Sequence, residues 1–443
     1  MIHRIDGIDP IEGIDRTDRP VTGERARPVV TTLMEAWMTI MAGDRRPVPV
    51  RPDAARWTTR SAVRGVLVVV HNVTSGQRLI EAVRLLEGDL RVEVFFTMAP
   101  TVFSSGVAEF LDRLGATTLP WQRAVDMRFD LALAAGHGGL HELDAPVVVM
   151  AHGAGHNKLV SAPHGGRAVA ARGTYGLSAQ WLIRDGQLVP ATILLAHTEE
   201  LTRLGTTCPE AVAVAVVAGD PNYDCLVASR PDRARYRDAL RIGARQRHVV
   251  VTSTWGGNSL LGRTPELLHR MTVELPRDAY RVTALMHPNV WSGHGAWQVR
   301  SWLAESLREG LTLIPPEDDW RGVLVSADCV VGDHGSLSLY ATATGAPVAL
   351  ATYPEADIDP ASPLGELAEF APRIRHRRSM LAQLSRIPEE FRRADYDRVA
   401  TRITSQPGAF ARNTRGLMYR HLKLKAPSSR PFARVADLPG PLR

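Results

Sequence analysis

The sequence alternates between short, continuously apolar segments and amphipathic segments with helical spacing. In the first half the apolar segments are GVLVVV (65–70), RVEVFFT (91–97), DLALAAG (130–136) and APVVVMA (145–151). Segments such as RLIEAVRLLEG (78–88) and VAEFLDRLG (107–115) separate them. Strands that are apolar on both faces must be covered on both faces, so this pattern predicts a parallel sheet between two layers of helices.

The same alternation begins again in the second half of the chain. Its apolar segments are HVVVTST (248–254), YRVTALMH (280–287), LTLIPP (311–316), DCVVGD (328–333) and PVALAT (347–352). Two successive units of this kind predict an α/β fold with two doubly wound, Rossmann-type domains facing across a cleft.

Changes in composition along the chain set the expected domain limits. The predicted segments are a flexible arm (1–29), a helix and linker (30–63), an N-terminal Rossmann-like domain (64–215), a hinge (216–245), a C-terminal Rossmann-like domain with terminal helices (246–425) and a flexible tail (426–443). The arm and the tail are rich in proline and charge and lack apolar periodicity, which is typical of loosely held termini.

Charge and cysteine content limit the partners and the compartment that we expect. With 53 Lys and Arg against 47 Asp and Glu the net charge is +6. This charge is too dispersed to indicate nucleic-acid binding, but it is compatible with a phosphate-bearing ligand. The three cysteines lack CxxC spacing, and no apolar run has membrane-spanning length. We therefore expect a cytoplasmic protein without a disulfide framework or a zinc site.

The segment that ends the strand DCVVGD contains the strongest candidate for a phosphate-binding turn. Asp333, His334, Gly335 and Ser336 follow the strand directly, and a helix is expected to begin near Ser338. Free N–H groups and the positive dipole end of a helix favour an anion at such a turn. Simple capping of the helix by Asp333 and Ser336 is the alternative.

A second candidate follows the strand APVVVMA. The loop HGAGHNKL places His152 at the strand end, Gly153 beside it and Lys158 six residues later. Because an unperturbed imidazole can accept a proton at neutral pH, His152 is a candidate general base. A histidine bonded to backbone in a tight turn is the equally simple alternative.

Two further loops follow strands of the second half. Ser253 and Thr254 end the first strand and lead into a glycine-rich turn, while His287 and Pro288 end the second. Ligands of doubly wound folds bind outside the carboxyl ends of the strands, so all four loops are expected at one site.

Other motifs are absent or weak. No GxSxG elbow supports a serine hydrolase, and no GxGxxG turn supports a nicotinamide dehydrogenase. WSGHGAW (291–297) is interpreted as a polar connection with aromatic anchors. RIRHRRSM (373–380) is interpreted as a solvated basic face, with contact at an anionic membrane surface as the alternative.

The order of these motifs resembles the GT-B transferases, and most closely the CDP-glycerol glycerophosphotransferases that build teichoic-acid-type polymers. His152, Gly153, Lys158 and Leu159 match that family's HG-x4-KL loop. His287 and Pro288 match its HP, and the turn from Asp333 to Ser336 is similar to its D-x-S-S turn. Where the family has PTWR, this chain has Ser253, Thr254, Trp255 and Gly256. A weaker similarity connects the chain with UDP-N-acetylglucosamine 2-epimerases.

The resemblance implies a metal-independent transferase that uses a nucleotide-diphospho donor as its substrate and needs no separate cofactor. A glycerophosphate or glycosyl group would pass to an acceptor hydroxyl, with the acceptor on the N-terminal domain (64–215) and the nucleotide donor on the C-terminal domain (246–425). His152 and His287 are the expected catalytic residues, and Gly153 and Lys158 the acceptor loop. The expected donor-binding residues are Ser253, Thr254, His287, Asp333, His334, Gly335, Ser336 and Ser338. A nucleotide-sugar 2-epimerase and a non-enzymatic ligand-binding protein of the same fold are the alternatives.

Overall fold

A computed structural model describes residues 64–101, 103–160 and 173–440. The predicted arm (1–29) and the predicted helix and linker (30–63) lie outside the described residues.

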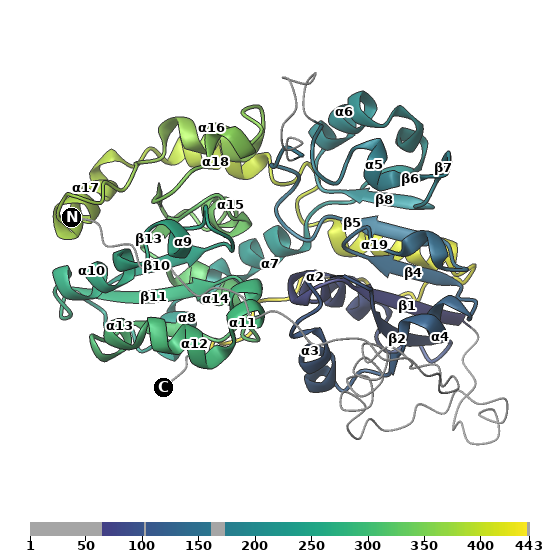
Figure 1. Cartoon of the computed structure of the whole chain (residues 1–443), viewed down its shortest axis with the longest axis horizontal. Coiled ribbons are helices and arrows are strands. Elements are labelled where there is room, and N and C mark those ends of the chain that lie inside the picture. Colours follow the sequence, from purple (N-terminus) through teal and green to yellow (C-terminus); the bar gives the residue numbers. More distant parts are fainter. Residues whose placement is uncertain (1–63, 102, 161–172, 441–443) are drawn as a thin grey trace, which may run out of the picture. The chain divides into compact units, whose positions relative to one another are not determined.

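The first sheet is parallel and has the strand order β3-β2-β1-β4-β5-β8-β9 (Figure 1). The strands are β1 (Arg64–Val70), β2 (Val92–Met98), β3 (Thr118–Leu119), β4 (Leu131–Ala134), β5 (Val147–Met150), β8 (Thr192–Leu195) and β9 (Ala215–Val217). In register, Val68 of β1 lies between Phe96 of β2 and Leu133 of β4. All three side chains are buried, as expected for a sheet covered on both faces.

The helices of this first domain follow its strands. They are α2 (Val73–Val83), α3 (Val107–Leu114), α4 (Trp121–Val125), α5 (Ala179–Leu182) and α6 (Thr198–Thr207), and a small antiparallel pair joins β6 (Ile183–Arg184) to β7 (Gln187–Leu188). Asn72 caps α2 by accepting a hydrogen bond from the Ser75 backbone N–H, and Ser75 bonds back to the Asn72 N–H. This capping box fixes the helix start directly after β1.

The second sheet is also parallel and has the order β12-β11-β10-β13-β14. Its strands are β10 (Arg247–Ser253), β11 (Tyr280–Met286), β12 (Thr312–Ile314), β13 (Cys329–Gly332) and β14 (Val348–Leu350). Its helices are α9 (Leu260–Arg263), α10 (Glu266–Glu274), α11 (Pro288–His294), α12 (Ala296–Trp302), α13 (Ala304–Arg308), α14 (Trp320–Ser326), α15 (Ser336–Thr342), α16 (Pro363–Phe370), α17 (Met380–Glu390) and α18 (Arg393–Thr401). The order confirms the predicted fold class, because each sheet is doubly wound about its first strand.

The predicted connection at 291–297 is helical instead. Residues of this segment belong to α11 and α12, which meet at Gly295 with a φ of 81°. The Trp291 side chain is buried among apolar residues of β10, β11 and α10 in the second domain. This burial favours a packed helix over a polar connection.

The segment predicted as the hinge, 216–245, is mostly helical. The last strand of the first sheet, β9, extends to Val217, and two helices follow, α7 (Pro221–Ser229) and α8 (Arg233–Ala239). Leu226 and Tyr236 of these helices are buried in the core of the second domain. The segment is therefore mostly packed helix, because its apolar residues recur at helical spacing and bury against α14.

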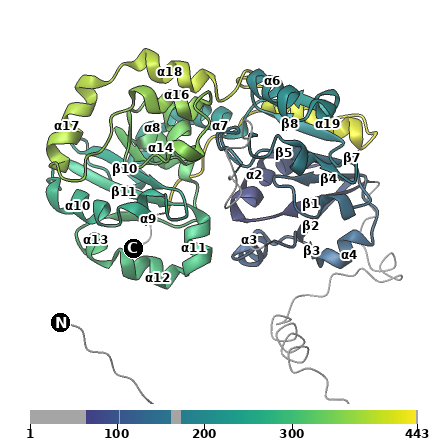
Figure 2. The same ribbon diagram turned by 45° about the horizontal axis from the view of Figure 1, so that its top comes forward.

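The end of the chain returns to the first domain. Helix α19 (Phe410–His421) lies beside β4, β5 and β8 in both views (Figures 1 and 2). Phe410 and Met418 of this helix are buried in the first core, and the Arg64 Nε donates to the Leu422 carbonyl. The predicted extension of the second domain to residue 425 therefore includes a helix that packs elsewhere.

Residues 426–440 also differ from the predicted flexible tail. The Ala436 side chain is buried, and its N–H and carbonyl bond to the Ser229 hydroxyl and the Tyr236 hydroxyl. The Gly440 N–H donates to Asp318 at 2.7 Å. A segment without periodicity is held here by backbone hydrogen bonds, which hydropathy does not reveal.

Candidate functional site

The loop after β5 approaches the turn between β13 and α15. A Cβ added to Gly153 would overlap the Ser336 hydroxyl oxygen, so the two segments are in close contact. Gly153 belongs to the first domain and Ser336 to the second. The structure therefore brings together two predicted site segments that lie far apart in the sequence. Position 153 requires a glycine because any side chain there would collide with Ser336.

Asp333 organises the turn rather than presenting a free carboxylate. Its Oδ2 accepts hydrogen bonds from the N–H groups of Thr254 and Leu260 at 2.9 and 2.8 Å. Its Oδ1 accepts from the Gly335 N–H at 2.9 Å. The side chain is fully buried, and burial raises the pKa of the carboxyl although these N–H groups favour its charged form. Asp333 thus ties the loop after β10 to the turn after β13.

Two of the predicted donor-binding serines are also internal. The Ser338 hydroxyl donates to the Asp333 carbonyl at 2.7 Å and has no exposed surface. The Ser253 hydroxyl donates to the Thr254 carbonyl, accepts from the Leu261 N–H, and is 2% exposed. Direct contact of Ser253, Asp333 and Ser338 with a donor stays a prediction, and in this structure their side chains are engaged by backbone groups. They shape the loops, because buried polar groups take backbone partners.

The remaining predicted groups have polar atoms without a protein partner in the described part of the chain. The Ser336 and Thr254 hydroxyls and the Lys158 amine have no hydrogen-bond partner among the described residues, and the buried Nδ1 of His334 has none either. Gly335 is half-buried and places its backbone beside Thr254. An unpartnered polar atom in a buried position is costly unless a ligand or water satisfies it.

His287 is held in one orientation by its neighbours. Its Nδ1 accepts from the Asn289 N–H at 3.0 Å, and its Nε2 lies 3.3 Å from the Thr74 hydroxyl of the first domain. With Nδ1 as acceptor, the proton of a neutral ring is on Nε2. His287 therefore presents a hydrogen-bond donor where the two domains meet.

Burial keeps the histidines of the site neutral. Desolvation lowers the pKa of His152 to about 4, and the charges of His156 and Lys158 lower it further. Desolvation also lowers the pKa of His287 to about 3, with His152 and Lys158 as secondary causes. For His334 the pKa falls to about 4 through desolvation and the Lys158 charge. The shared causes show that these groups lie in one electrostatic neighbourhood.

His152 is exposed to water although protein atoms surround it. Lys158 is likewise exposed, and desolvation lowers its pKa while Asp333 and Asp357 raise it. A bound anion would pair with the Lys158 charge and would favour the protonated form of the neighbouring histidines.

We expect anion binding at this site to take up protons. An anion raises the depressed pKa values of His152, His287 and His334, so the complex binds more protons than the free protein and its stability increases as the pH falls. The affinity for inorganic pyrophosphate should rise at least about threefold between pH 7.5 and pH 5.5. Titration calorimetry in buffers of different ionisation enthalpy measures the uptake. An affinity independent of pH would contradict the expectation.

The structure adds a pair that the sequence analysis missed. His156 Nδ1 lies 2.8 Å from Glu200 Oε1, and Glu200 Oε2 accepts from the Ala196 N–H at 2.7 Å. Burial raises the pKa of Glu200, but the charge of His156 and the hydrogen bonds outweigh it and lower the pKa to about 2. In the sequence Glu200 is indistinguishable from a capping residue of α6, so only the fold reveals the pair.

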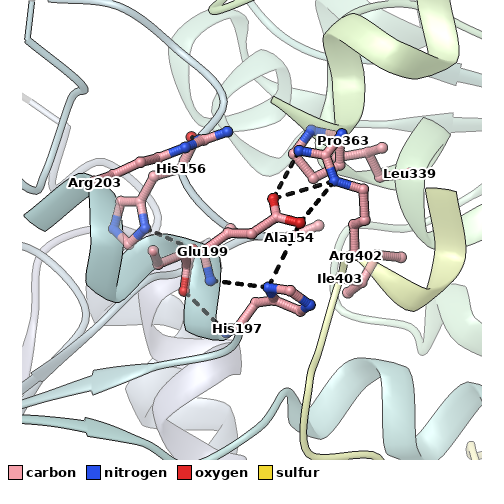
Figure 3. A pocket seen from close by; sticks show the side chains of 11 residues that line it. Ala154, His156, His197, Glu199, Arg203, Leu339, Pro363, Arg402 and Ile403 are labelled. Atoms are coloured by element: carbon pink, nitrogen blue, oxygen red, sulfur yellow. Dashed lines mark hydrogen bonds and ion pairs between the residues drawn. The ribbon is translucent and has the colours of Figure 1, made fainter. Parts of the chain in front are cut away.

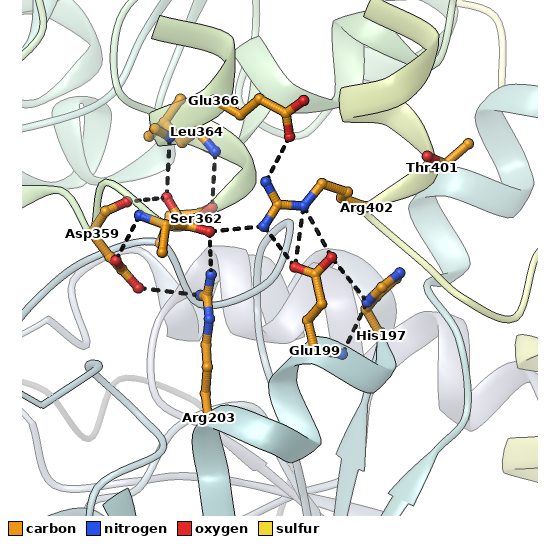
Figure 4. A network of polar contacts seen from close by, with 12 residues as sticks. His197, Glu199, Arg203, Asp359, Ser362, Leu364, Glu366, Thr401 and Arg402 are labelled. Carbon is orange, nitrogen blue, oxygen red and sulfur yellow. Dashed lines mark hydrogen bonds and ion pairs between the residues drawn. The ribbon is translucent and has the colours of Figure 1, made fainter. Parts of the chain in front are cut away.

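The loop that holds His152 is anchored through this region (Figure 3). Arg203 donates to the His156 carbonyl at 2.8 Å. The Arg203 guanidinium also lies 3.6 Å from the Asp359 carboxylate (Figure 4). Arg402 pairs with Glu199 at 2.7 Å and with Glu366 at 2.6 Å (Figure 4). These ion pairs join α6 of the first domain to residues in and near α16 of the second domain. Because Arg203 also bonds to the His156 carbonyl, they position the loop of His152 relative to both domains.

Other motifs from the sequence have structural roles. His71 Nε2 bonds to the Gly138 carbonyl at 2.9 Å, and a Cβ on Gly136 would lie 2.7 Å from the His71 ring, so GHGGLH forms a loop packed on that histidine. In the basic segment 373–380 the Arg373 guanidinium lies over the Tyr353 ring. Within the described residues no group of three His, Cys, Asp or Glu side chains is arranged to hold a metal ion. No helix in the same residues is long and apolar enough to cross a membrane.

Comparisons with solved structures support the fold. The wall teichoic acid polymerase TagF matches with a TM-score of 0.52 at 12% identity, covering 90% of this chain and 99% of that one. A TagF variant soaked with CDPG matches with a TM-score of 0.54 at 11% identity, covering 89% and 97%. The chain has the GT-B fold. The S. aureus MnaA–UDP structure also matches, with a TM-score of 0.50 at 11% identity, covering 83% and 100%.

No family model matches the chain, and a comparison with curated proteins finds no match either. The GT-B assignment therefore stands on architecture, and identities of 11–12% leave donor and acceptor to be inferred from the site. In this GT-B chain the predicted site segments lie at the carboxyl ends of strands in both sheets.

Proposed function

We propose that this chain is a metal-independent GT-B transferase that moves a glycerophosphate or glycosyl group from a nucleotide-diphospho donor to an acceptor hydroxyl. The observation that carries the proposal is the approach of the loop containing His152 to the turn containing Ser336. A candidate base from one domain thereby lies beside a candidate phosphate-binding turn from the other.

The groups divide into two roles. His152 accepts the proton of the acceptor hydroxyl as its oxygen attacks the transferred group. The bond from that group to the nucleotide phosphate breaks at the same time, and the electron pair leaves with the phosphate. His287, Ser336 and the backbone of the turn at 334–336 stabilise the charge that develops there. Lys158 supplies a positive charge at the same site.

A ligand screen tests the class of donor. Thermal-shift assays with CDP-, UDP-, GDP- and dTDP-linked compounds should reveal one nucleotide that stabilises the protein. At about 100 times its dissociation constant the ligand adds about 2.7 kcal/mol to the free energy of unfolding. If UDP-sugars incubated without any acceptor are epimerised, as NMR would show, the 2-epimerase alternative replaces transfer. If no donor binds at all, the proposal fails.

The double variant Ser336→Ala, His287→Ala tests the donor site. Each replacement removes a hydrogen bond to a charged phosphate, worth roughly 1.5–3 kcal/mol. We expect donor affinity to fall more than about tenfold, while stability falls only by the roughly 1 kcal/mol expected from loss of the His287 cap of α11, as measured by calorimetric titration and thermal unfolding. His141→Ala with Ser385→Ala, two exposed positions away from the turn, is the matched control. Unchanged donor affinity in the test variant would locate the nucleotide elsewhere.

A further inference from the structure

A hollow lies beside the candidate site and contains none of the predicted site residues. Its volume is about 270 Å³, just below the roughly 300–1,000 Å³ of sites for drug-sized ligands, so it suits a smaller ligand. It is lined by Phe103, Ser105, Trp255, Gly256, Asn289, Val290, Ser292, Gly293 and His294. These residues follow β2 of the first sheet and β10 and β11 of the second, so both domains form the hollow.

Two exposed aromatic side chains flank the hollow. Phe103 is 44% exposed and Trp255 is 42% exposed, and their ring centroids lie 5.3 Å apart with a tilt of 59°. The Trp255 centroid also lies 6.5 Å from that of His287. Large aromatic surfaces left in water beside a catalytic centre favour a ligand that covers them.

The polar lining is neutral. The side chains of Ser105, Asn289 and Ser292 make no hydrogen bond to other described residues. The lining has no Asp, Glu, Lys or Arg, and its single titratable side chain, His294, packs edge-on against Trp302 at 4.8 Å. A charged ligand group would find no counter-charge among these residues, whereas hydroxyl groups would find an amide and two hydroxyls.

Two glycines of the lining have open space beside them. A Cβ added to Gly256 or to Gly293 would meet nothing within 4 Å, so the glycines face open space. A Cβ on Gly106 at the start of α3 would lie 3.3 Å from the Ser292 Cβ, so the two domains approach each other closely there.

We propose that this hollow binds a neutral carbohydrate ring of the acceptor, an inference that rests on the proposed transferase function. Trp255 and Phe103 cover the apolar C–H faces of the sugar, and Ser105, Asn289 and Ser292 bond its hydroxyls. The combination of large aromatic faces with a few uncharged polar groups is suited to this class of ligand. Because Trp255 neighbours His287, a sugar bound in the hollow lies next to the residue proposed to stabilise the leaving phosphate.

Binding is tested without any reaction. Saturation-transfer NMR with methyl α-glucoside, chitotriose and maltotriose should show transfer from the protein to the C–H protons of at least one sugar. Trp255→Ala should abolish that transfer. Trp297→Ala removes a tryptophan that is 73% exposed and outside the hollow, and should leave the transfer unchanged.

A second variant fills the hollow without removing a contact. Gly293 lines the hollow, lies within α11 and has room for a side chain, so Gly293→Leu suits the helix and adds bulk to the lining. It should weaken sugar binding at least about tenfold while the melting temperature is kept or raised. Sugar binding that survives both variants, or transfer to cytidine or uridine but to no sugar, overturns the proposal. Because the sugars are tested alone, the outcome is separate from the donor screen that tests the transferase function.

Discussion

His152→Ala should lower kcat by about 10² to 10⁴-fold while donor affinity barely changes. His152 lies at the end of β5 in the loop that contacts the Ser336 turn, and its pKa of about 4 leaves the ring unprotonated and able to accept a proton at neutral pH. Steady-state kinetics at saturating donor, with direct titration of donor binding, measure both quantities. His141→Ala, which changes an exposed histidine elsewhere, is the control. A variant that keeps its kcat but loses donor affinity would make His152 a donor ligand instead.

The pH profile gives an independent check on the same residue. NMR titration of the His152 ring in the free protein should give a pKa of about 4, mainly because the ring is desolvated and secondarily because of the charges of His156 and Lys158. A bound anionic donor raises that pKa, because it favours the protonated ring. The ascending limb of kcat at saturating donor should therefore lie at higher pH than the midpoint in the free protein. A limb at the same or lower pH would argue against His152 as the base.

Asp220→Asn should lower the free energy of unfolding by about 3–5 kcal/mol, because it leaves the Arg78 charge buried without its partner. The Arg78 and Asp220 side chains are 4% and 0% exposed and lie 2.7 Å apart. The Asp220 carboxylate also accepts from the Tyr340 hydroxyl at 2.9 Å and caps α7 through the Tyr223 N–H. Helix α2, the start of α7 and α15 are thus joined by one buried carboxylate. Urea unfolding measures the change.

Two further variants separate charge from packing. Combining Asp220→Asn with Arg78→Met removes the buried charge along with its partner, so part of the lost stability should return. Glu309→Gln breaks the exposed Arg277–Glu309 pair and should cost less than about 1 kcal/mol. If Asp220→Asn and Glu309→Gln lower the free energy of unfolding equally, the buried Arg78–Asp220 pair does not stabilise the contact between α2, α7 and α15.

The fold was predictable because the hydrophobic pattern of each strand and helix lies within a short stretch of sequence. The apolar segments at 65–70 and 328–333 became β1 and β13, and the doubly wound order of both sheets follows from the alternation with helices. Strand ends were predictable for the same reason, and with them the positions of His152 and His287. Hydrophobic periodicity reports burial of an element, which is a property of the segment itself.

Contacts between distant segments were not predictable. The tail at 426–440, the packing of α7 and α8, and the return of α19 depend on which surface remained uncovered after the sheets formed. The same holds for Glu200, which pairs with His156 across 44 residues, and for Asp333, which looked like a ligand but bonds to backbone N–H groups of another loop.

The sequence by itself determined the two sheets, their winding and the loops that end their strands, because each depends on periodicity within about ten residues. Only the tertiary structure decided which polar atoms of those loops remain free. The sequence does not show whether a hydroxyl or carboxylate next to a strand end bonds to a backbone N–H or to a substrate. Whether such an atom has a protein partner depends on its burial and on the neighbours that folding brings within hydrogen-bond distance. Among the described residues, polar atoms without a protein partner remain on Ser336, His334, Lys158 and His152, whereas the side chains of Ser253, Asp333 and Ser338 are buried and hydrogen-bonded.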